Sequence, residues 1–151
     1  MLGVGQPAPD FALRDQHGQT VTLADLAGTP ALLVFFPFAF SGICSSELAD
    51  LRDHRSTFDN AGARILGVSC DPMFALRVFS DRDDFGFPLL SDFWPHGAVA
   101  TAYQCFSPEA GAATRSSFLV DAASTVRWTI SHDAGERRDI DLHLEALAQI
   151  H

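Results

Sequence analysis

The sequence predicts an α/β domain in which helices flank a central mixed β-sheet. Apolar runs of strand length alternate along the chain with segments of helical periodicity, and this alternation is typical of α/β folds. The chain has 151 residues, of which 47% are hydrophobic. A chain of this length usually builds one core rather than two, so we expect residues 1–151 to form a single domain.

The first predicted elements form an N-terminal β-hairpin extension. Residues 8–13 and 19–23 have the composition of short strands. The sequence between them, Asp15-Gln-His-Gly18, is rich in turn-forming residues. We therefore expect two short paired strands ahead of the main sheet.

Two strand and helix pairs follow the hairpin. Residues 31–36 form a continuous apolar strand, and residues 42–60 have the spacing of an amphipathic helix. Residues 63–69 are the next buried strand, and Pro72 favours a helix over 73–82 because proline suits the first helical turn. The chain therefore returns from each strand through a helix, as the α/β class requires.

The second half of the chain supplies the remaining elements. They are a short strand at 88–91, a helix at 97–103, strands at 116–120 and 125–130, and a closing helix at 140–150. Only a few residues separate the last two strands, which favours an antiparallel pair. A mixed sheet with an added N-terminal hairpin indicates a thioredoxin-like fold.

The composition excludes several classes of partner. Nineteen acidic residues against ten basic ones give a net charge of −9, which would repel nucleic acid. No apolar run is long enough to span a bilayer, and the first residues lack the basic start of a secretory signal, so we expect a cytoplasmic protein with no membrane partner. Motifs such as H-E-x-x-H and G-x-G-x-x-G are missing, so the sequence predicts no metal and no nucleotide cofactor.

Cys44 is the strongest candidate for chemistry. It lies at the start of the predicted helix 42–60, where unpaired amide N–H groups and partial positive charge stabilise a thiolate. Leu48, Leu51 and Phe58 lie on the same stripe of this helix, so the thiol should face the protein body. Cysteine is also a common small core residue, and this position alone leaves that alternative open.

The loop before Cys44 changes this interpretation. Pro37 is rigid and has no N–H, and Ser41 places a hydroxyl one turn before the sulfur, where an N-cap is the simpler alternative. With the pattern Pro-x-x-x-Ser-x-x-Cys, the chain resembles the peroxiredoxins, and residues 35–48 are most similar to their AhpE-type one-cysteine branch. The resemblance continues in the segments 3–11, 66–69, 87–92, 115–121 and 135–139.

The resemblance implies a thiol-dependent peroxidase that uses no metal or cofactor. Cys44 would be the peroxidatic nucleophile, which attacks a hydroperoxide and becomes a sulfenic acid. Pro37 would shield the thiol, and Ser41 would position the peroxide. Arg115 would be the fixed cation, because a guanidinium keeps its proton; without the resemblance it would be an exposed charge at a strand start. Glu47 could orient an arginine, or could simply be a favourable charge in the first helical turn.

The cysteine spacing predicts how the enzyme is reset. No cysteine lies five residues after Cys44 or in the C-terminal tail, where the resolving cysteines of related branches lie. We therefore expect a one-cysteine cycle in which an external thiol or a small dithiol oxidoreductase reduces the sulfenic acid. Cys70 and Cys105 are expected to be buried structural thiols. Apolar Phe38 and Phe40 near the site favour organic hydroperoxides beside hydrogen peroxide.

Two other functions compete with peroxide reduction. A thiol-disulfide oxidoreductase of thioredoxin type needs a second cysteine close to Cys44, and the neighbouring sequence has none. A peroxide-sensing redox regulator would use oxidised Cys44 to change partner binding. Five aromatic residues lie in predicted loops that border the site, and most of them are expected to lie in the core or to line the pocket: Phe38, Phe40, Phe74, Phe93 and Trp94. The peroxiredoxins often form dimers through such loops, so we also expect a homodimer.

Overall fold

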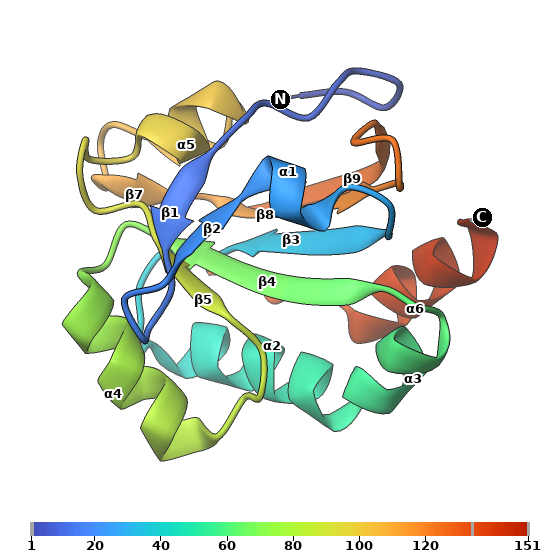
Figure 1. Cartoon of the computed structure of the whole chain (residues 1–151). Coiled ribbons are helices and arrows are strands. Elements are labelled where there is room, and N and C mark those ends of the chain that lie inside the picture. Colours follow the sequence, from blue (N-terminus) through green and yellow to red (C-terminus); the bar gives the residue numbers. More distant parts are fainter. Residues whose placement is uncertain (1, 134, 151) are drawn as a thin grey trace.

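Residues 2–133 and 135–150, described by a computed structural model, fold around a mixed β-sheet (Figure 1). The seven strands of this sheet are β1 (Ala12–Arg14), β2 (Thr20–Thr22), β3 (Ala31–Phe35), β4 (Arg64–Ser69), β5 (Leu89–Ser91), β8 (Arg115–Val120) and β9 (Val126–His132). The helices are α1 (Leu23–Leu26), α2 (Gly42–Asp53), α3 (Arg55–Asn60), α4 (Met73–Asp83), α5 (Ala98–Ala102) and α6 (Ile140–Gln149).

The strand order is β2-β1-β5-β4-β3-β8-β9. Strands β3, β4 and β5 are parallel, whereas β8 and β9 are antiparallel to each other and β8 is antiparallel to β3. The hairpin β1–β2 joins the opposite edge through an antiparallel pairing of β1 with β5. The mixed sheet, the N-terminal hairpin and the antiparallel final pair are therefore confirmed.

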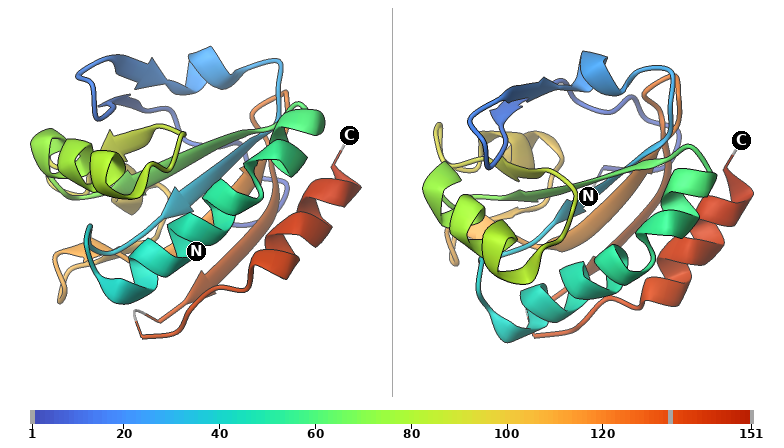
Figure 2. Two further views of the ribbon diagram at one scale, coloured as in Figure 1. Left: turned by 90° about the horizontal axis from the view of Figure 1, so that it is seen from below. Right: turned by 60° about the horizontal axis from the view of Figure 1, so that its bottom comes forward.

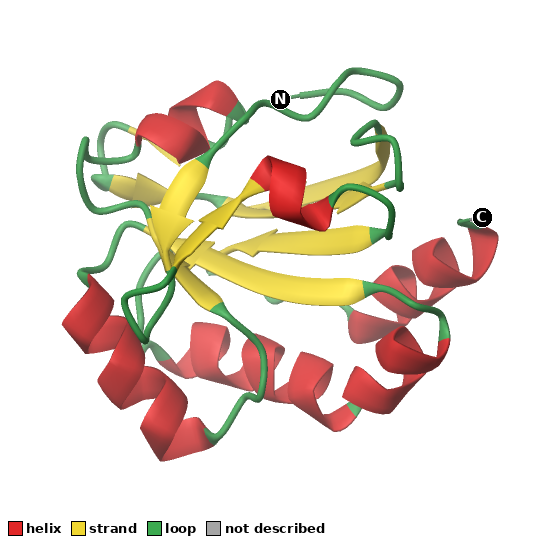
Figure 3. Ribbon diagram, viewed as in Figure 1, coloured by secondary structure: helices red, strands yellow, loops and turns green. Residues whose placement is uncertain are grey.

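Helices cover both faces of the sheet, and the two faces have separate cores (Figure 3). Side chains alternate along a strand, so Leu33 and Phe35 of β3 point into the core that α1 and α5 cover. Leu32 and Val34 point into the second core, on the opposite face of the sheet. The second core is covered by α2, α3, α4 and α6, and it contains Cys44. Helices α2 and α6 lie side by side on this face (Figure 2).

The helix predicted over 42–60 is divided into α2 and α3 by His54. The ring Nδ1 of His54 lies 2.8 Å from the carbonyl oxygen of Asp50, and the backbone N–H of His54 donates to the same oxygen. The residue has φ −106° and ψ 10°, outside the helical values. Apolar spacing does not reveal the break, because Leu51 and Phe58 remain buried on either side of it.

Two short strands were not predicted. Strands β6 (Phe106–Ser107) and β7 (Ala112–Ala113) pair with each other in a separate two-stranded sheet. Two residues are too few to show any periodicity, so sequence patterns do not find such strands. The predicted domain of residues 1–151 includes residues 1, 134 and 151, which lie outside the described residues. Over the part of the chain that is described, none of the helices is long and apolar enough to cross a membrane.

Candidate active site

Cys44 is the third residue of α2, the helix that follows β3 in the chain. The loop 36–41 connects the two elements, and Ser41 is the N-cap of the helix. Cys44 has an exposed fraction of 0% and packs in the core with Leu48 and Leu51. The prediction that the thiol faces the protein body is confirmed.

Ser41 is joined directly to Cys44. The Ser41 Oγ accepts a hydrogen bond from the backbone N–H of Cys44 at 3.2 Å. This contact is the N-cap that was considered as the simpler alternative, and it fixes the hydroxyl within one turn of the thiol. A hydroxyl that accepts such a bond keeps its own hydrogen as a donor, so capping does not prevent it from binding a peroxide oxygen.

Residues that follow β4 and residues of α4 hold the loop between β3 and α2 in place. Pro37 is buried in it, and the backbone N–H of Ala39 donates to Asp71 Oδ2 at 2.8 Å. Phe40 has a φ of +70°, which is strained for a bulky side chain. Its ring lies 5.1 Å from that of Phe79, and the guanidinium of Arg82 lies over it at 5.1 Å. These contacts with α4 compensate the strain and fix the loop that precedes the thiol.

Glu47, one turn after Cys44 on α2, binds two buried arginines. Its Oε1 accepts from Arg115 Nη1 at 2.5 Å and from Arg138 Nη2 at 3.0 Å. Its Oε2 accepts from Arg138 Nε at 2.9 Å and from the Arg138 backbone N–H at 2.7 Å. Each of the three residues is exposed by 4% or less. Glu47 therefore contacts two arginines, and these hydrogen bonds link Arg115 to the helix of Cys44.

The charges of this cluster favour an anion next to α2. Burial alone would raise the pKa of Glu47, but the hydrogen bonds and charge of Arg138, together with the charge of Arg115, hold that pKa below its usual range. Glu47 therefore stays ionised at neutral pH. One carboxylate and two guanidinium groups carry one net positive charge, and the N-terminus of α2 adds partial positive charge. This environment suits a thiolate or a developing oxyanion.

Arg138 is a site residue that sequence reasoning missed. Its Nη1 donates to the Phe35 carbonyl at 2.8 Å and to Ser117 Oγ at 3.1 Å, so it connects the end of β3 with β8 as well as with Glu47. The tail at 135–139 was part of the resemblance, but no role was assigned to its arginines. Arg137 and Arg138 are adjacent, and only the fold distinguishes them, because Arg137 is exposed and pairs with Asp50.

His143 of α6 extends the cluster. Its Nε2 lies 2.9 Å from Ser117 Oγ, and its Nδ1 lies 2.9 Å from the Asp139 carbonyl. Burial, with help from the Arg138 charge, lowers the pKa of His143 from 6.5 to about 4. The ring is therefore neutral at pH 7, with Nδ1–H donating to the carbonyl and Nε2 accepting from the serine.

This low pKa predicts a dependence of stability on pH. Between pH 6.5 and about 4 the unfolded chain binds a proton at His143 that the folded chain does not, so the free energy of unfolding falls as the pH falls through that window. The full effect is about 3 kcal/mol at 1.36 kcal/mol per pKa unit. Four charged groups face the ring: Glu47 and Asp50 on α2, and Arg138 and Asp139 before α6. A substitution of His143 leaves all four in place, so a comparison with wild type isolates the ring.

Urea unfolding of wild type and His143→Gln across this window measures the difference. The wild-type curve should decline more steeply with falling pH than the curve of the variant, which lacks the titrating ring. Parallel curves would show that His143 does not titrate as described.

Cys70 and Cys105 are buried free thiols, as predicted. Burial, with the charges of Asp92 and Asp71, raises the pKa of Cys70 to about 11. Burial and the charge of Asp92 also raise the pKa of Cys105. Both residues are therefore protonated at neutral pH, and a protonated thiol is a poor nucleophile.

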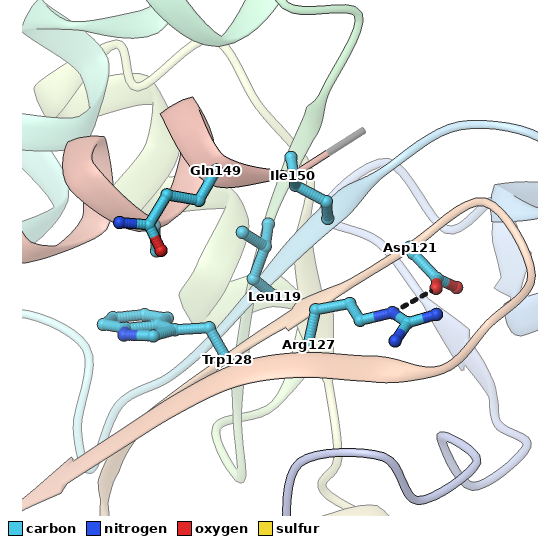
Figure 4. A pocket seen from close by; sticks show the side chains of 7 residues that line it. Leu119, Asp121, Arg127, Trp128, Gln149 and Ile150 are labelled. Carbon is cyan, nitrogen blue, oxygen red and sulfur yellow. Dashed lines mark hydrogen bonds and ion pairs between the residues drawn. The ribbon is translucent and has the colours of Figure 1, made fainter.

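Two surface pockets lie apart from the Cys44 cluster. One, of about 350 Å³, lies between β9 and α6; Trp128 and Gln149 flank it, and the ion pair of Arg127 with Asp121 lies toward its other end (Figure 4). The other, of about 460 Å³, is lined by Phe74, Phe93 and Trp94. These three rings and those of Phe38 and Phe40 are exposed, so the expectation that most of them lie in the core or line the pocket of the site is wrong. Neither pocket is lined by any of the predicted site residues.

Comparisons with known proteins give one consistent result. The sequence profile of the AhpC/TSA family matches residues 4–129. The chain is 48% identical to alkyl hydroperoxide reductase E of Mycobacterium tuberculosis over 151 residues, which cover 99% of each chain.

Solved structures agree with the sequence comparison. The peroxidoxin BcpB of Mycobacterium tuberculosis has a TM-score of 0.87 at 28% identity, covering 98% of this chain and 97% of that one. AhpC of Enterococcus faecalis has a TM-score of 0.90 at 24% identity, covering 98% of this chain and 92% of that one, and at this identity it supports the fold alone. The thioredoxin-like α/β fold predicted from the sequence is therefore confirmed.

Proposed function

Because the chain belongs to the AhpC/TSA family and is a thiol-dependent peroxidase of the alkyl hydroperoxide reductase E type, we propose that Cys44 is the residue that attacks the peroxide. The Cys44 thiolate forms a bond to the terminal oxygen of a hydroperoxide while the O–O bond breaks. The other oxygen leaves with the electron pair of that bond and takes up a proton to become alcohol or water. Cys44 is left as a sulfenic acid.

The placement of Cys44 carries this proposal. The thiol is buried at the first turn of α2, one turn before the glutamate that binds two buried arginines. Negative charge moves from the sulfur to the leaving oxygen during the reaction, and donors fixed in a water-poor site stabilise that charge. One such donor is typically worth about 3 kcal/mol in the transition state. The buried cluster supplies this stabilisation without rearranging water.

The remaining predicted residues have distinct roles in this proposal. Arg115 supplies the fixed positive charge, and Glu47 positions it through their hydrogen bond. Ser41 holds the peroxide through its hydroxyl hydrogen while its oxygen caps α2. Pro37 shields the thiol side of the loop, because it is buried and offers no N–H to water.

Substitutions of Ser41 separate peroxide binding from helix capping. We expect Ser41→Thr to retain peroxidase activity, because threonine also has a hydroxyl and also caps helices. Ser41→Ala should lose much of the activity, whereas Ser41→Asp should keep a cap without a hydroxyl and should also be slow. The second-order rate constant with hydrogen peroxide measures each variant. If Ser41→Ala reacts as fast as wild type, the hydroxyl has no role in binding peroxide.

An external reductant resets Cys44 in this proposal. Cys70 and Cys105 are buried and protonated at neutral pH, which makes both poor partners for attack on a sulfenic acid. A low-molecular-weight thiol or a small dithiol oxidoreductase therefore completes the cycle.

The proposed substrates include organic hydroperoxides as well as hydrogen peroxide. The exposed rings of Phe38 and Phe40, in the loop before Cys44, support this part of the proposal. We also propose that the protein is located in the cytoplasm, where the reducing conditions keep cysteines such as its three free thiols reduced.

A homodimer is part of the same proposal. The exposed aromatic residues Phe74, Phe93 and Trp94 lie around one surface pocket, and Trp94 is 82% exposed. Apolar surface of this kind on a folded domain favours a contact between protein chains. Light scattering of the dilute protein should give the mass of a dimer, and the mass of a monomer would contradict the contact.

A further inference from the structure

We propose that His143 is a positioning residue of the peroxidase site, which acts through Ser117 and Arg138 on the pair of Glu47 and Arg115. This inference rests on the proposed role of Cys44 and adds a contribution from the C-terminal helix. Helix α6, which carries His143, lies beside α2, which carries Cys44 and Glu47 (Figure 2). A chain of hydrogen bonds links the two helices through β8.

His143 is held as a fixed acceptor. The side chain is 4% exposed, and its ring packs edge to face against Trp128 with 5.1 Å between centroids. The Asp139 carbonyl accepts from Nδ1, because a carbonyl oxygen can only accept, and this bond leaves Nε2 of the neutral ring as an acceptor. Nε2 lies 2.9 Å from Ser117 Oγ. The serine hydroxyl must therefore donate to His143.

This bond orients the serine toward Arg138. With its hydrogen directed at His143, Ser117 Oγ presents lone pairs to Arg138 Nη1 at 3.1 Å. Without an acceptor at position 143, the buried hydroxyl hydrogen would lose its partner and the hydroxyl could rotate. A hydrogen turned toward Arg138 would oppose another donor. His143 therefore decides whether Ser117 supports the guanidinium.

Arg138 carries the effect to the reacting cysteine. The same guanidinium donates to both oxygens of Glu47 and to the carbonyl of Phe35, the last residue of β3 before the loop that leads to Cys44. Glu47 Oε1 in turn accepts from Arg115. A shift of Arg138 would therefore move the carboxylate that holds Arg115. Small displacements of a positioned group lower rates strongly while leaving the fold intact.

The chain offers variants that separate positioning from packing. His143→Leu removes the acceptor and keeps an apolar side chain, whereas His143→Gln can present an amide oxygen in place of Nε2. Ser117→Ala removes the relay itself, and the double variant of Ser117→Ala with His143→Leu tests whether both act through one bond. His17→Leu, at an exposed histidine away from the cluster, is the matched control.

Two reactions of Cys44 are measured for each variant: oxidation by hydrogen peroxide and alkylation by iodoacetamide. Both need an accessible thiolate, which the same positive cluster favours, but only oxidation also needs the arginines to stabilise a leaving oxygen. The ratio of the two rates therefore separates stabilisation of the leaving oxygen from formation of the thiolate. We expect His143→Leu and Ser117→Ala to lower the oxidation rate about tenfold and the alkylation rate by less than about twofold. His143→Gln should restore most of the oxidation rate, the double variant should be no slower than the worse single variant, and His17→Leu should equal wild type.

Several outcomes would overturn the relay. These are a wild-type oxidation rate in His143→Leu, a His143→Gln variant as slow as His143→Leu, or equal losses in oxidation and alkylation. If His143→Leu does not fold, the comparison of His143→Gln with Ser117→Ala decides in the same way. Wild type and Cys44→Ser are measured in the same assay. If wild type shows no oxidation that depends on Cys44, the proposed function fails and the relay fails with it; if it does, unchanged variants overturn the relay alone.

Discussion

Replacing Cys44 with serine is expected to abolish rapid reduction of hydroperoxides. A serine hydroxyl is not ionised at neutral pH, so the buried position at the start of α2 would hold no nucleophile for the peroxide oxygen. The loss should be on the order of a thousandfold or more, as for other residues that form the covalent intermediate. Peroxide consumption with an added thiol as reductant measures it.

Cys70→Ser and Cys105→Ser are the matched controls for this change. Burial and nearby negative charge raise the pKa values of both thiols, to about 11 in the case of Cys70. They should therefore keep rates close to that of wild type with an external thiol. Turnover in Cys44→Ser, or its loss in either control, would show that another cysteine performs the reaction. A single stoichiometric reaction of wild type without turnover would instead favour a peroxide sensor.

Replacing Glu47 with glutamine is expected to damage stability and activity together. The substitution keeps the size of the side chain but removes the carboxylate that pairs with both Arg115 and Arg138. Breaking a buried ion pair from one side typically costs about 3–5 kcal/mol, because the remaining charge stays buried. The amide –NH₂ would also face arginine donors. The peroxide rate should fall on the order of a hundredfold, because Arg115 loses its ion pair with Glu47 and shifts from its position.

Urea unfolding and the peroxide rate measure the two effects of Glu47→Gln. Glu109→Gln serves as the control, because Glu109 is exposed and far from α2 in the sequence. That variant should match wild type in both measurements. If Glu47→Gln lowers the free energy of unfolding by less than about 1 kcal/mol and keeps the wild-type peroxide rate, the ion pairs contribute no more than ordinary surface salt bridges.

Local sequence patterns predicted the fold and the part of the site around Cys44. The apolar strand before Cys44 and the helix after it follow from residue periodicity, and the serine cap follows from residue type at a helix start. At the break, a ring nitrogen of His54 lies 2.8 Å from the Asp50 carbonyl oxygen, and no spacing rule contains that contact. The two-residue strands β6 and β7 are too short to have a pattern.

The supporting part of the site is a property of tertiary structure. Arg138 lies 91 residues from Glu47 in the chain, and Ser117 lies 26 residues from His143. Each of these side chains is polar and would be expected on the surface, and only the packing of α6 and β8 against α2 shows that they satisfy one another. The sequence contains the residues, but their partners are set by the fold.

Mass mapping of the oxidised protein tests the central claim most directly. The reduced protein is treated with one equivalent of hydrogen peroxide, trapped with a sulfenic acid reagent and digested without reductant. We predict the label on Cys44 alone, its loss when thiol is added before the trap, and no label in Cys44→Ser. Label on another cysteine, or a disulfide between Cys44 and either Cys70 or Cys105, would contradict a one-cysteine peroxidase built around Cys44.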